Sequence, residues 1–468
     1  MRHPLRPSKK HCGEENVNIK AIDQYIEAHL EDSIEELSRL LRQPSVAAQN
    51  LGIEACAKLV SDSLKARGFD VQVLPTGGSP VVFGERKGRK DETLIAYNHY
   101  DVQPAEPLEL WDSPAFEPTQ RDGRLYARGV SDNKGNFIER LHAIDAILES
   151  EGELPCNVKF VVEGEEEIGS VNLEPFVRKH QALLAGDVCV WEIGGVDHQN
   201  YPIQMVGLRG ICYVELHAKT ANRDVHSGTG GSIFPNAAWR LVWALASLKD
   251  KNEMIRLPNF YDDVVPPSER EIELLELMPD MTEYYMKEFD LAGFLKGIKD
   301  PLELAVEAVY KPTCTICGLT SGYQGQGSKT VLPAEASAKV DFRLVPNQTP
   351  DKVLAQLRAH LDAHGFEDIE IVNLGGNPAA KTNPDHPAVQ IAVEAARDVY
   401  EKPTRVIPMI GGSGPNFIFQ KYLGVPIISS GAGDSNSKAH APNESISLDL
   451  YVKGAKHFAR ILMLMGKE

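Results

Sequence analysis

The segment VKFVVEGEEEIGS, residues 158–170, contains an apolar run that leads into four glutamates within five residues. The apolar run predicts a buried strand, so Glu163, Glu165, Glu166 and Glu167 would lie where this strand ends. Like charges this close repel one another, and burial strengthens the repulsion. Two explanations are open at this point: a solvated acidic loop whose charges water screens, or a bound cation that the carboxylates surround.

Helical and strand patterns alternate around this segment. Strands are predicted at DVQVLP, PVVFGER, TLIAYNHYDV and GDVCVWEIGG, and helices over residues 22–41, IEACAKLVSDSLKARGF and residues 136–148. Helices that alternate with apolar strands are typical of an α/β fold with a mostly parallel sheet and helices on both faces.

The pattern changes near Ile211. The strand ICYVELHAKT alternates, and a helix, a long acidic and mostly helical insertion over residues 250–310, the strand EASAKVDFRLV, a second helix and the strand IEIVNL follow. This order predicts a small α+β (ferredoxin-like) domain inserted into the first one. We therefore expect a catalytic domain in two parts, residues 1–211 (with a tail over 1–18) and 376–468, and an inserted domain over 212–375.

Composition narrows the classes of function. The net charge of -17 disfavours nucleic acid or an anionic membrane surface as the main partner. No run of about 20 apolar residues is present, and the basic start of the chain lacks the apolar stretch of a secretory signal. Seven scattered cysteines, with one CxxC at Cys314 and Cys317 that reads as structural, suit a reducing compartment and predict a cytoplasmic protein. No GxGxxG or P-loop follows a strand, which argues against a nucleotide-binding α/β protein.

Residues of ligand type follow the predicted strands or lie in adjoining loops. They are His99, Asp101, Asp132, Glu192, Asp434 and His440, in addition to the glutamate cluster. Taken singly, His99 could be a core histidine, Asp132 a helix cap and His440 a loop histidine. Because the carboxyl ends of parallel strands meet at one edge, where ligands bind, their convergence favours a metal site.

The types of ligand indicate the chemistry. Imidazole and carboxylate without thiolate favour zinc, manganese or cobalt. The set suffices for two divalent ions about 3.5–4 Å apart, an arrangement used for hydrolysis. One glutamate of the cluster would bind metal, while its neighbour accepts a proton from water and passes it to a leaving amine.

Seven motifs occur in order: HYDVQP, RGVSDNKG, EGEEEIGS, HSGTGG, DFRLVP, GGSGP and HAPNE. Through them the chain, from about residue 20 to its end, resembles the di-zinc aminoacylase/carnosinase peptidase family, and most closely its Cys-Gly and carnosine-type dipeptidase branch. The resemblance implies five metal ligands: His99 and Glu192 on one ion, Glu167 and His440 on the other, and Asp132 on both, often followed by a cis peptide bond.

The resemblance also implies roles for residues beside the metals. Glu166 would be the general base and acid, and Asp101 would orient His99. The other residues to which it gives roles lie further along the chain: His226, Thr330, Arg343, Gly412 and Ser413.

In the inserted domain, which would act as a lid and dimerisation domain, His226 would reach the site of a second copy in a homodimer and steady the oxyanion. Arg343 would clamp a substrate carboxylate, with Gly412 and Ser413 as further donors, and Thr330 would contribute from the partner chain. Without the resemblance, His226 reads as a loop histidine and Arg343 as a surface arginine.

These expectations define a di-metal hydrolase that cleaves the amide bond of dipeptides or other short peptides with a free C-terminal carboxylate. An N-acyl amino acid deacylase or carboxypeptidase with the same site is the alternative, and an inactive metal-binding scaffold is less favoured. Many dipeptidases of this branch carry Asp where this chain has Glu192, whereas the carboxypeptidase and deacylase relatives tend to carry Glu. The expected cofactors are two zinc ions, with manganese or cobalt as alternatives.

Overall fold

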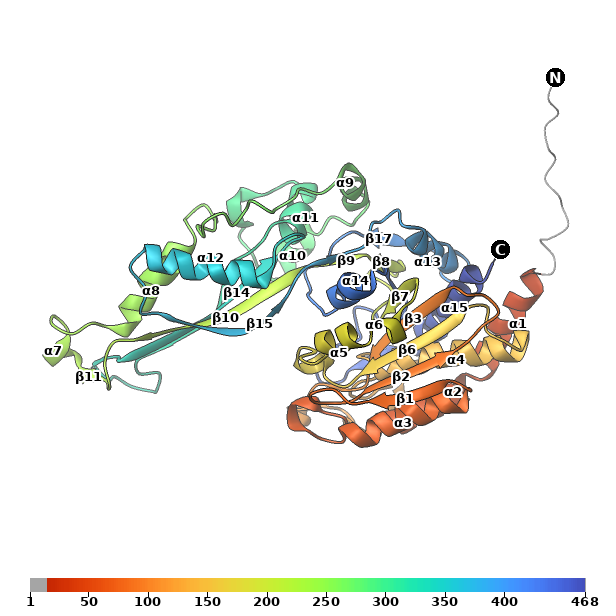
Figure 1. Ribbon diagram of the computed structural model, residues 1–468. Helices are drawn as coiled ribbons and strands as arrows, with labels where there is room; N and C mark the ends of the chain where they lie inside the picture. The colour runs from red at the N-terminus through yellow and green to blue at the C-terminus, as the bar shows by residue number, and fades with distance from the viewer. Residues whose placement is uncertain (1–14, 468) are drawn as a thin grey trace, which may run out of the picture. The chain divides into compact units, whose positions relative to one another are not determined.

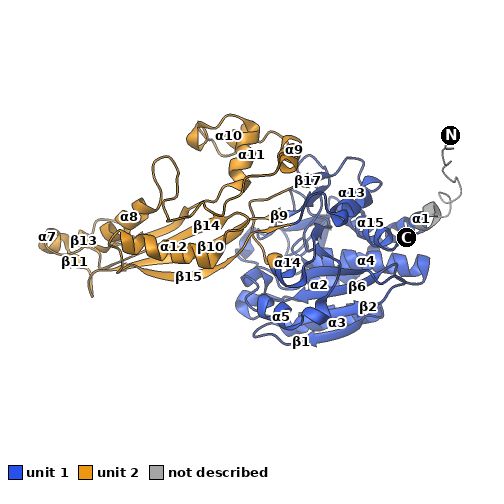
Figure 2. Cartoon of the chain, turned by 45° about the horizontal axis from the view of Figure 1, so that its top comes forward, with its two compact units in different colours: residues 1–206, 382–406, 418–468 blue, residues 207–381, 407–417 orange. Residues whose placement is uncertain are grey.

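The computed structural model describes residues 15–467, and its contacts divide the chain into two compact units (Figure 2). Unit 1 comprises residues up to 206, 382–406 and 418 onward, and unit 2 comprises residues 207–381 and 407–417. Most of the tail predicted over residues 1–18 lies outside the described residues, and the first helix begins at Glu15.

The central sheet of unit 1 has six strands (Figure 1). Their order is β1 (Asp70–Leu74), β2 (Val81–Arg86), β6 (Asn157–Glu163), β3 (Thr93–His99), β7 (Val188–Trp191) and β18 (Ile427–Ser429). β6, β3, β7 and β18 are parallel, whereas β1 and β2 are antiparallel at one edge. The predicted α/β fold is confirmed, and its parallel part comprises four adjacent strands.

Helices cover both faces of this sheet. Successive side chains of a strand point to opposite faces, and every residue of β3 and β6 is buried, so both faces need a covering layer. Leu94, Ala96 and Phe160 share one core with α1 (Glu15–Ala28), α2 (Leu30–Leu41), α3 (Ile53–Ala66), α4 (Lys134–Glu151), α13 (Pro387–Arg397) and α15 (Leu448–Met465). On the other face, Tyr97 and Trp191 contact Phe419 of α14 (Phe417–Leu423). The Lys159 amine on that face donates to carbonyls at the end of α6 (Gln181–Leu184), which follows α5 (Leu173–Lys179).

The helix predicted over residues 22–41 is two helices, α1 and α2, separated at His29. Apolar residues continue at spacings of three and four on both sides of His29, and both helices contact α4. A one-residue break that preserves this spacing leaves no signal in the hydrophobic pattern.

Unit 1 is completed by short strands. β4 (Thr119–Arg121), β5 (Arg124–Tyr126) and β19 (Ser445–Ser447) form a three-stranded sheet, and β8 (Ile203–Met205) pairs with β17 (Arg405–Ile407). Among the helices of residues 15–467, none combines the length and the apolar composition needed to cross a membrane.

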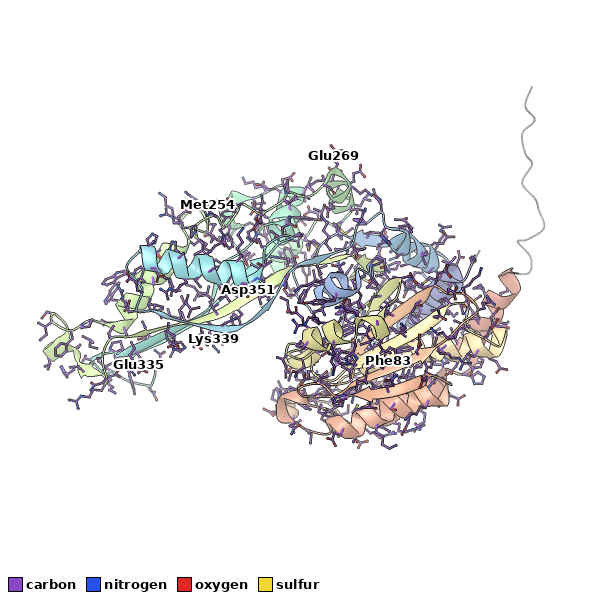
Figure 3. The ribbon with its side chains drawn as sticks, in the orientation of Figure 1. Phe83, Met254, Glu269, Glu335, Lys339 and Asp351 are labelled. Atoms are coloured by element: carbon purple, nitrogen blue, oxygen red, sulfur yellow. The ribbon has the colours of Figure 1, made fainter. Side chains whose placement is uncertain are left out.

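Unit 2 is built on a four-stranded antiparallel sheet. Its strand order is β12 (Thr315–Ser321), β14 (Glu335–Leu344), β10 (Gly210–Lys219) and β15 (Glu370–Asn377). Alternate residues of β10 and β14 are buried against α8 (Ala237–Leu248) and α12 (Pro350–Ala363). Glu335 and Lys339 of β14 point to the opposite, exposed face (Figure 3).

The remaining elements of unit 2 are short. They are β9 (Gly207–Leu208), β11 (Val225–His226), α7 (Ser227–Gly230), α9 (Glu269–Glu276), α10 (Thr282–Glu288), α11 (Pro301–Tyr310), β13 (Val331–Leu332) and β16 (Ala380–Lys381). The helices α9 to α11 lie in the acidic insertion over residues 250–310, but more than half of that insertion is turns and irregular chain, so the prediction that it is mostly helical is wrong.

The limits of the two units differ from the predicted domain limits of 212 and 375 by a few residues. A larger difference concerns residues 407–417, which group with unit 2 and not with the second part of the catalytic domain. A β-bridge between Leu208 and Ile410 and a hydrogen bond from Arg343 to Ser413 link this segment to unit 2. Both are contacts between residues far apart in sequence, which local patterns do not report.

Candidate metal centre

The candidate ligands gather at the carboxyl-terminal edge of the unit 1 sheet. β3 ends at His99, which lies in register beside Glu163 at the end of β6. β7 ends at Trp191 and is followed by Glu192, and the loop after β18 carries His440. Asp132 comes two residues before α4 begins.

A glycine lets the chain turn from β6 into the single turn η3 (Glu166–Ile168), which carries Glu166 and Glu167. A Cβ atom at Gly164 would lie 2.3 Å from the ring of Tyr100, so a larger residue there would have to displace buried structure. The glycine within EGEEE therefore permits the close approach that directs both glutamates to the sheet edge.

Asp132 lies between two histidines. Its Oδ1 is 2.9 Å from Nε2 of His99, and its Oδ2 is 2.9 Å from Nε2 of His440. His440 Nε2 is also 3.1 Å from Oε2 of Glu167, and His99 Nε2 is 3.8 Å from Oε2 of Glu192. One carboxylate thus faces two nitrogen–carboxylate pairs, which is the geometry required of a bridging ligand.

These residues fit a divalent cation. The Nδ1–H of His99 donates to the backbone carbonyl of Asp101 at 3.0 Å, so a neutral imidazole directs the Nε2 lone pair at carboxylates. The Oε2 atom of Glu192 is buried and has no hydrogen-bond partner. Acceptor lone pairs that converge at one point are what a cation satisfies, and a mixed nitrogen and oxygen donor set suits zinc-like ions. Ligand atoms of His99, Asp132 and Glu167 lie within 4.8 Å of one another.

The pKa values of the clustered side chains also indicate a site for a cation. Burial raises the pKa of Glu166 to about 7 and the pKa of Glu192 well above its usual range, with neighbouring carboxylates adding to both. Hydrogen bonds to Asp132 and Glu167 raise the pKa of His440 to about 10. Burial and neighbouring carboxylates thus disfavour the ionised glutamates, and a bound cation would favour them.

Asp101 positions both sides of the site. Its carboxylate accepts hydrogen bonds from the backbone N–H groups of Glu166 and Glu167 at 3.2 and 3.0 Å, while its carbonyl holds His99. Gln103, a residue of HYDVQP that was not predicted to belong to the site, donates to Oε2 of Glu167 at 2.8 Å. One loop after β3 thus orients ligands from two strands.

Glu163 and Glu165 are buried, so the solvated acidic loop considered for this cluster does not describe them. Glu163 accepts hydrogen bonds from the hydroxyls of Tyr97 and Ser170. Glu165 accepts from the backbone N–H of Ser79 at 2.9 Å and from the side chain of Asn172 at 2.8 Å. The cluster divides into two carboxylates at the site and two that hold the surrounding chain.

Asp132 is not a helix cap, and Asp434 is not part of the candidate metal centre. The N-cap position of α4 is Asn133, which makes no side-chain cap hydrogen bond, and the Asp132 carboxylate faces the histidines. The peptide bond between Asp132 and Asn133 is cis. Asp434, also at a strand end, forms an ion pair with Arg124 at 2.7 Å and does not join the ligand group.

Residues predicted to contact substrate form two groups within unit 2. Arg343, on the exposed face of β14, donates to the hydroxyl of Ser413 at 2.9 Å and to Asp341 at 3.1 Å, and Gly412 adjoins Ser413. His226 pairs with Val331 across β11 and β13, next to Thr330. The structure therefore brings together residues 70 and about 100 positions apart in the sequence, and their contact with substrate stays a prediction.

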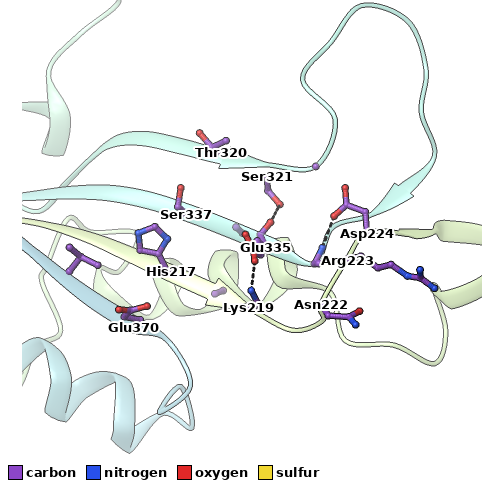
Figure 4. Close-up of a pocket in the computed structure, with 15 residues that line it drawn as sticks. His217, Lys219, Asn222, Arg223, Asp224, Thr320, Ser321, Glu335, Ser337 and Glu370 are labelled. Atoms are coloured by element: carbon purple, nitrogen blue, oxygen red, sulfur yellow. Dashed lines mark hydrogen bonds and ion pairs between the residues drawn. The ribbon is translucent and has the colours of Figure 1, made fainter.

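Unit 2 also has a separate hollow of about 900 Å³ on the open face of its sheet (Figure 4). Several of its polar groups are already paired: Lys219 with Glu335 at 2.6 Å, and Asp224 with the backbone N–H of Ala334 at 2.9 Å. Unlike the edge of the unit 1 sheet, this hollow gathers no group of metal-ligand side chains among the described residues, and we assign no site to it.

The fold and the site together define a metal-dependent hydrolase. The profile described as Peptidase family M20/M25/M40 matches residues 95–464, and the chain belongs to this family. The predicted resemblance is thereby confirmed, and with it the expectation of divalent metal binding.

Similar proteins include dipeptidases and a carboxypeptidase. The chain is 29% identical to Beta-Ala-His dipeptidase of Rattus norvegicus over 96% of both proteins. It is 27% identical to Cys-Gly metallodipeptidase dug1 of Schizosaccharomyces pombe, over 94% of this chain and 97% of that protein. Among solved structures, the M20 family metallo-carboxypeptidase Sso-CP2 from Sulfolobus solfataricus has a TM-score of 0.88 at 37% identity, covering 93% of this chain and 99% of that one.

Proposed function

We propose that the chain is a dipeptidase that hydrolyses the amide bond of dipeptides or other short peptides with a free C-terminal carboxylate. The observation that carries the proposal is the Asp132 carboxylate between His99 and His440, with Glu167, the neighbour of Glu166, 3.1 Å from His440. The two curated relatives described above, which match almost the whole chain, support a dipeptide as substrate.

Two divalent ions would be held by the five ligands, His99, Asp132, Glu167, Glu192 and His440. Zinc is our first assignment, and manganese and cobalt suit the same donors. When bound, such ions lower the pKa of water and polarise the scissile carbonyl.

Glu166 is the residue proposed to move the proton. It is half-buried and adjoins Glu167, and its backbone N–H is held by Asp101 at 3.2 Å. In this proposal its carboxylate accepts a proton from the attacking water and returns it to the leaving amine.

Arg343 and Ser413 are proposed to hold the substrate carboxylate. A guanidinium can form two parallel hydrogen bonds with a carboxylate, and the Arg343 side chain is already oriented by Asp341 and Ser413. This requirement would restrict cleavage to bonds near a free C-terminus.

We further propose a homodimer, in which His226 and Thr330 serve the site of the second copy. Exposed apolar residues of unit 2 support an interface between copies: Trp239 and Trp243 of α8, which stack with ring centres 5.7 Å apart, and Ile316 and Leu319 of the edge strand β12. The cytoplasmic location expected from the cysteines stays a prediction.

The dimer can be tested by complementation. Glu166→Gln and His226→Ala chains, each inactive alone, should regain about a quarter of wild-type activity per chain when mixed and allowed to exchange. A chain that light scattering shows to be a fully active monomer would refute the crossed arrangement.

Carboxypeptidase or deacylase activity is the competing function, supported by the 37% identity to Sso-CP2 and by Glu192 at the metal centre. The deciding experiment gives the zinc- or manganese-loaded protein free dipeptides, matched N-acetyl amino acids and longer peptides. Faster cleavage of free dipeptides supports the proposal, whereas faster cleavage of the acylated or longer substrates favours the competing function.

A further inference from the structure

A buried carboxylate that no step above uses holds the loop of Asp132. It belongs to Glu444, the last residue of HAPNE, whose side chain is fully buried. Its Oε1 accepts hydrogen bonds from the backbone N–H groups of Ser131 and Asp132, at 2.8 and 3.0 Å. Its Oε2 accepts from the backbone N–H of Gly129 at 2.9 Å and from the Arg128 guanidinium at 2.8 Å.

Glu444 also connects two loops that meet at the site. It follows His440 by four residues, and its own carbonyl accepts a hydrogen bond from the backbone N–H of Ala127 at 3.2 Å. The strand that begins immediately after it, β19, pairs with β5, which precedes the Asp132 loop. The segment that supplies His440 is thereby fastened to the segment that supplies Asp132.

The His440 loop needs such an anchor because its backbone is strained. His440 and Asn443 have φ values of 62° and 61°, in the left-handed region that non-glycine residues seldom adopt. Such conformations persist only where the surroundings impose them. Asn443 contributes by accepting from the backbone N–H of Asp112 at 2.9 Å and donating to the carbonyl of Leu110 at 3.0 Å.

The chemistry of these contacts calls for a carboxylate. Four donors converge on the side chain, and an ionised carboxylate offers four lone-pair sites and no hydrogen. An amide of the same shape would turn its NH₂ group toward N–H donors, leaving buried groups unpaired. Arg128 supplies the positive charge that makes the buried negative charge tolerable.

We infer that Glu444 is a positioning residue of the metal centre: it fixes the backbone at Asp132 so that one carboxylate oxygen faces His99 and the other His440. The inference rests on the proposed function only in taking Asp132 as the bridging ligand. Residues that orient metal ligands without touching the ion affect affinity by about 10- to 100-fold when they are replaced.

The test measures metal binding by Glu444→Gln with Zn²⁺ and Co²⁺ alone, without substrate. Competition with a chelator should show about 10- to 100-fold weaker binding than in the wild type, and the visible absorption of the cobalt-loaded protein should change because the ligands move. Glu444→Asp keeps the carboxylate but shortens the side chain by one methylene, and it should reduce metal affinity less than Glu444→Gln does. It also provides the measurement if Glu444→Gln does not fold.

Glu36→Gln is the matched control. Glu36 on α2 accepts hydrogen bonds from Ser63 at 2.8 Å and from Arg67 at 2.7 and 3.0 Å, so it too is a carboxylate held by an arginine and a neutral donor. Its replacement should lower thermal stability and leave the cobalt spectrum and metal affinity unchanged.

Wild-type metal affinity and cobalt spectrum in both Glu444 variants, with only thermal stability reduced as in the control, would overturn the inference. A wild-type protein that binds metal but cleaves no dipeptide would count against the proposed function alone, because the metal measurement involves no substrate.

Discussion

Glu271 in unit 2 and Glu192 in unit 1 are both buried glutamates, but their side chains have different partners. In unit 2, Glu271 accepts hydrogen bonds from the backbone N–H of Ser268 and the hydroxyl of Tyr310, both at 2.8 Å, and pairs with Lys381 at 2.5 Å. In unit 1, Glu192 faces His99 and other carboxylates, and its Oε2 has no hydrogen-bond partner.

The pKa values follow this difference. Burial alone would raise the pKa of Glu271, but hydrogen bonds from Lys381 and Ser268 lower it below its usual value. Burial and the nearby Glu166 raise the pKa of Glu192 well above its usual range. The buried charge of Glu271 is balanced by its own neighbours in unit 2, whereas Glu192 lies among carboxylates that a bound cation would balance.

The largest effect is expected from Glu166→Gln, because Glu166 is proposed to act on protons while its neighbours hold metal. Turnover should fall by about 10²- to 10⁴-fold or more, with metal content unchanged. Steady-state kinetics and elemental analysis of the same preparation measure both quantities. Full activity would show that Glu166 is not the proton carrier, and loss of metal would place it among the ligands.

Removal of metal is expected to destabilise unit 1 and to leave unit 2 largely unchanged. Bound metal stabilises the folded state by about 2.7 kcal/mol at a free concentration 100 times Kd, so a chelator should lower the unfolding temperature. Hydrogen exchange should quicken in the loops after β3, β6, β7 and β18 of unit 1, while the sheet of unit 2 keeps its protection. Equal changes of hydrogen exchange in both units would contradict the claim that bound metal stabilises unit 1 in particular.

A smaller effect is expected from Glu271→Gln in unit 2. Loss of hydrogen bonds to a charged group should reduce the free energy of unfolding by about 1.5–3 kcal/mol, without changing metal content. Denaturant unfolding of the two proteins measures the difference.

The contribution of Glu271 should also depend on pH. Because the pKa of Glu271 is lower in the folded protein, its stabilisation is present above the unfolded value of 4.5 and is lost as pH falls through the lower folded value. Wild type and Glu271→Gln should therefore converge in stability in acid. A difference that stays constant from pH 7 to pH 3 would contradict this assignment.

Much of the fold could be predicted from the sequence because buried strands are rich in apolar residues. The strands at residues 81–86 and 93–99 are apolar runs that the structure buries, and the ends of such runs show where polar side chains must emerge. The position of Glu166 and Glu167 just after β6 needs only the boundary between VKFVV and EGEEE. Local composition was sufficient for these features, since each depends on neighbours within one element.

Only the tertiary structure decided which of these groups face one another. The resemblance implied that Asp132 lies between His99 and His440, but no local pattern did. That residues 407–417 join unit 2 and that Glu444 holds the Asp132 loop came from the structure alone, and all three depend on contacts across 33 to more than 300 positions. Such contacts arise from the order of strands in the sheet and the course of the loops between them. The pattern of a single strand or helix carries no record of that order, because it reports which face is buried and not what covers it.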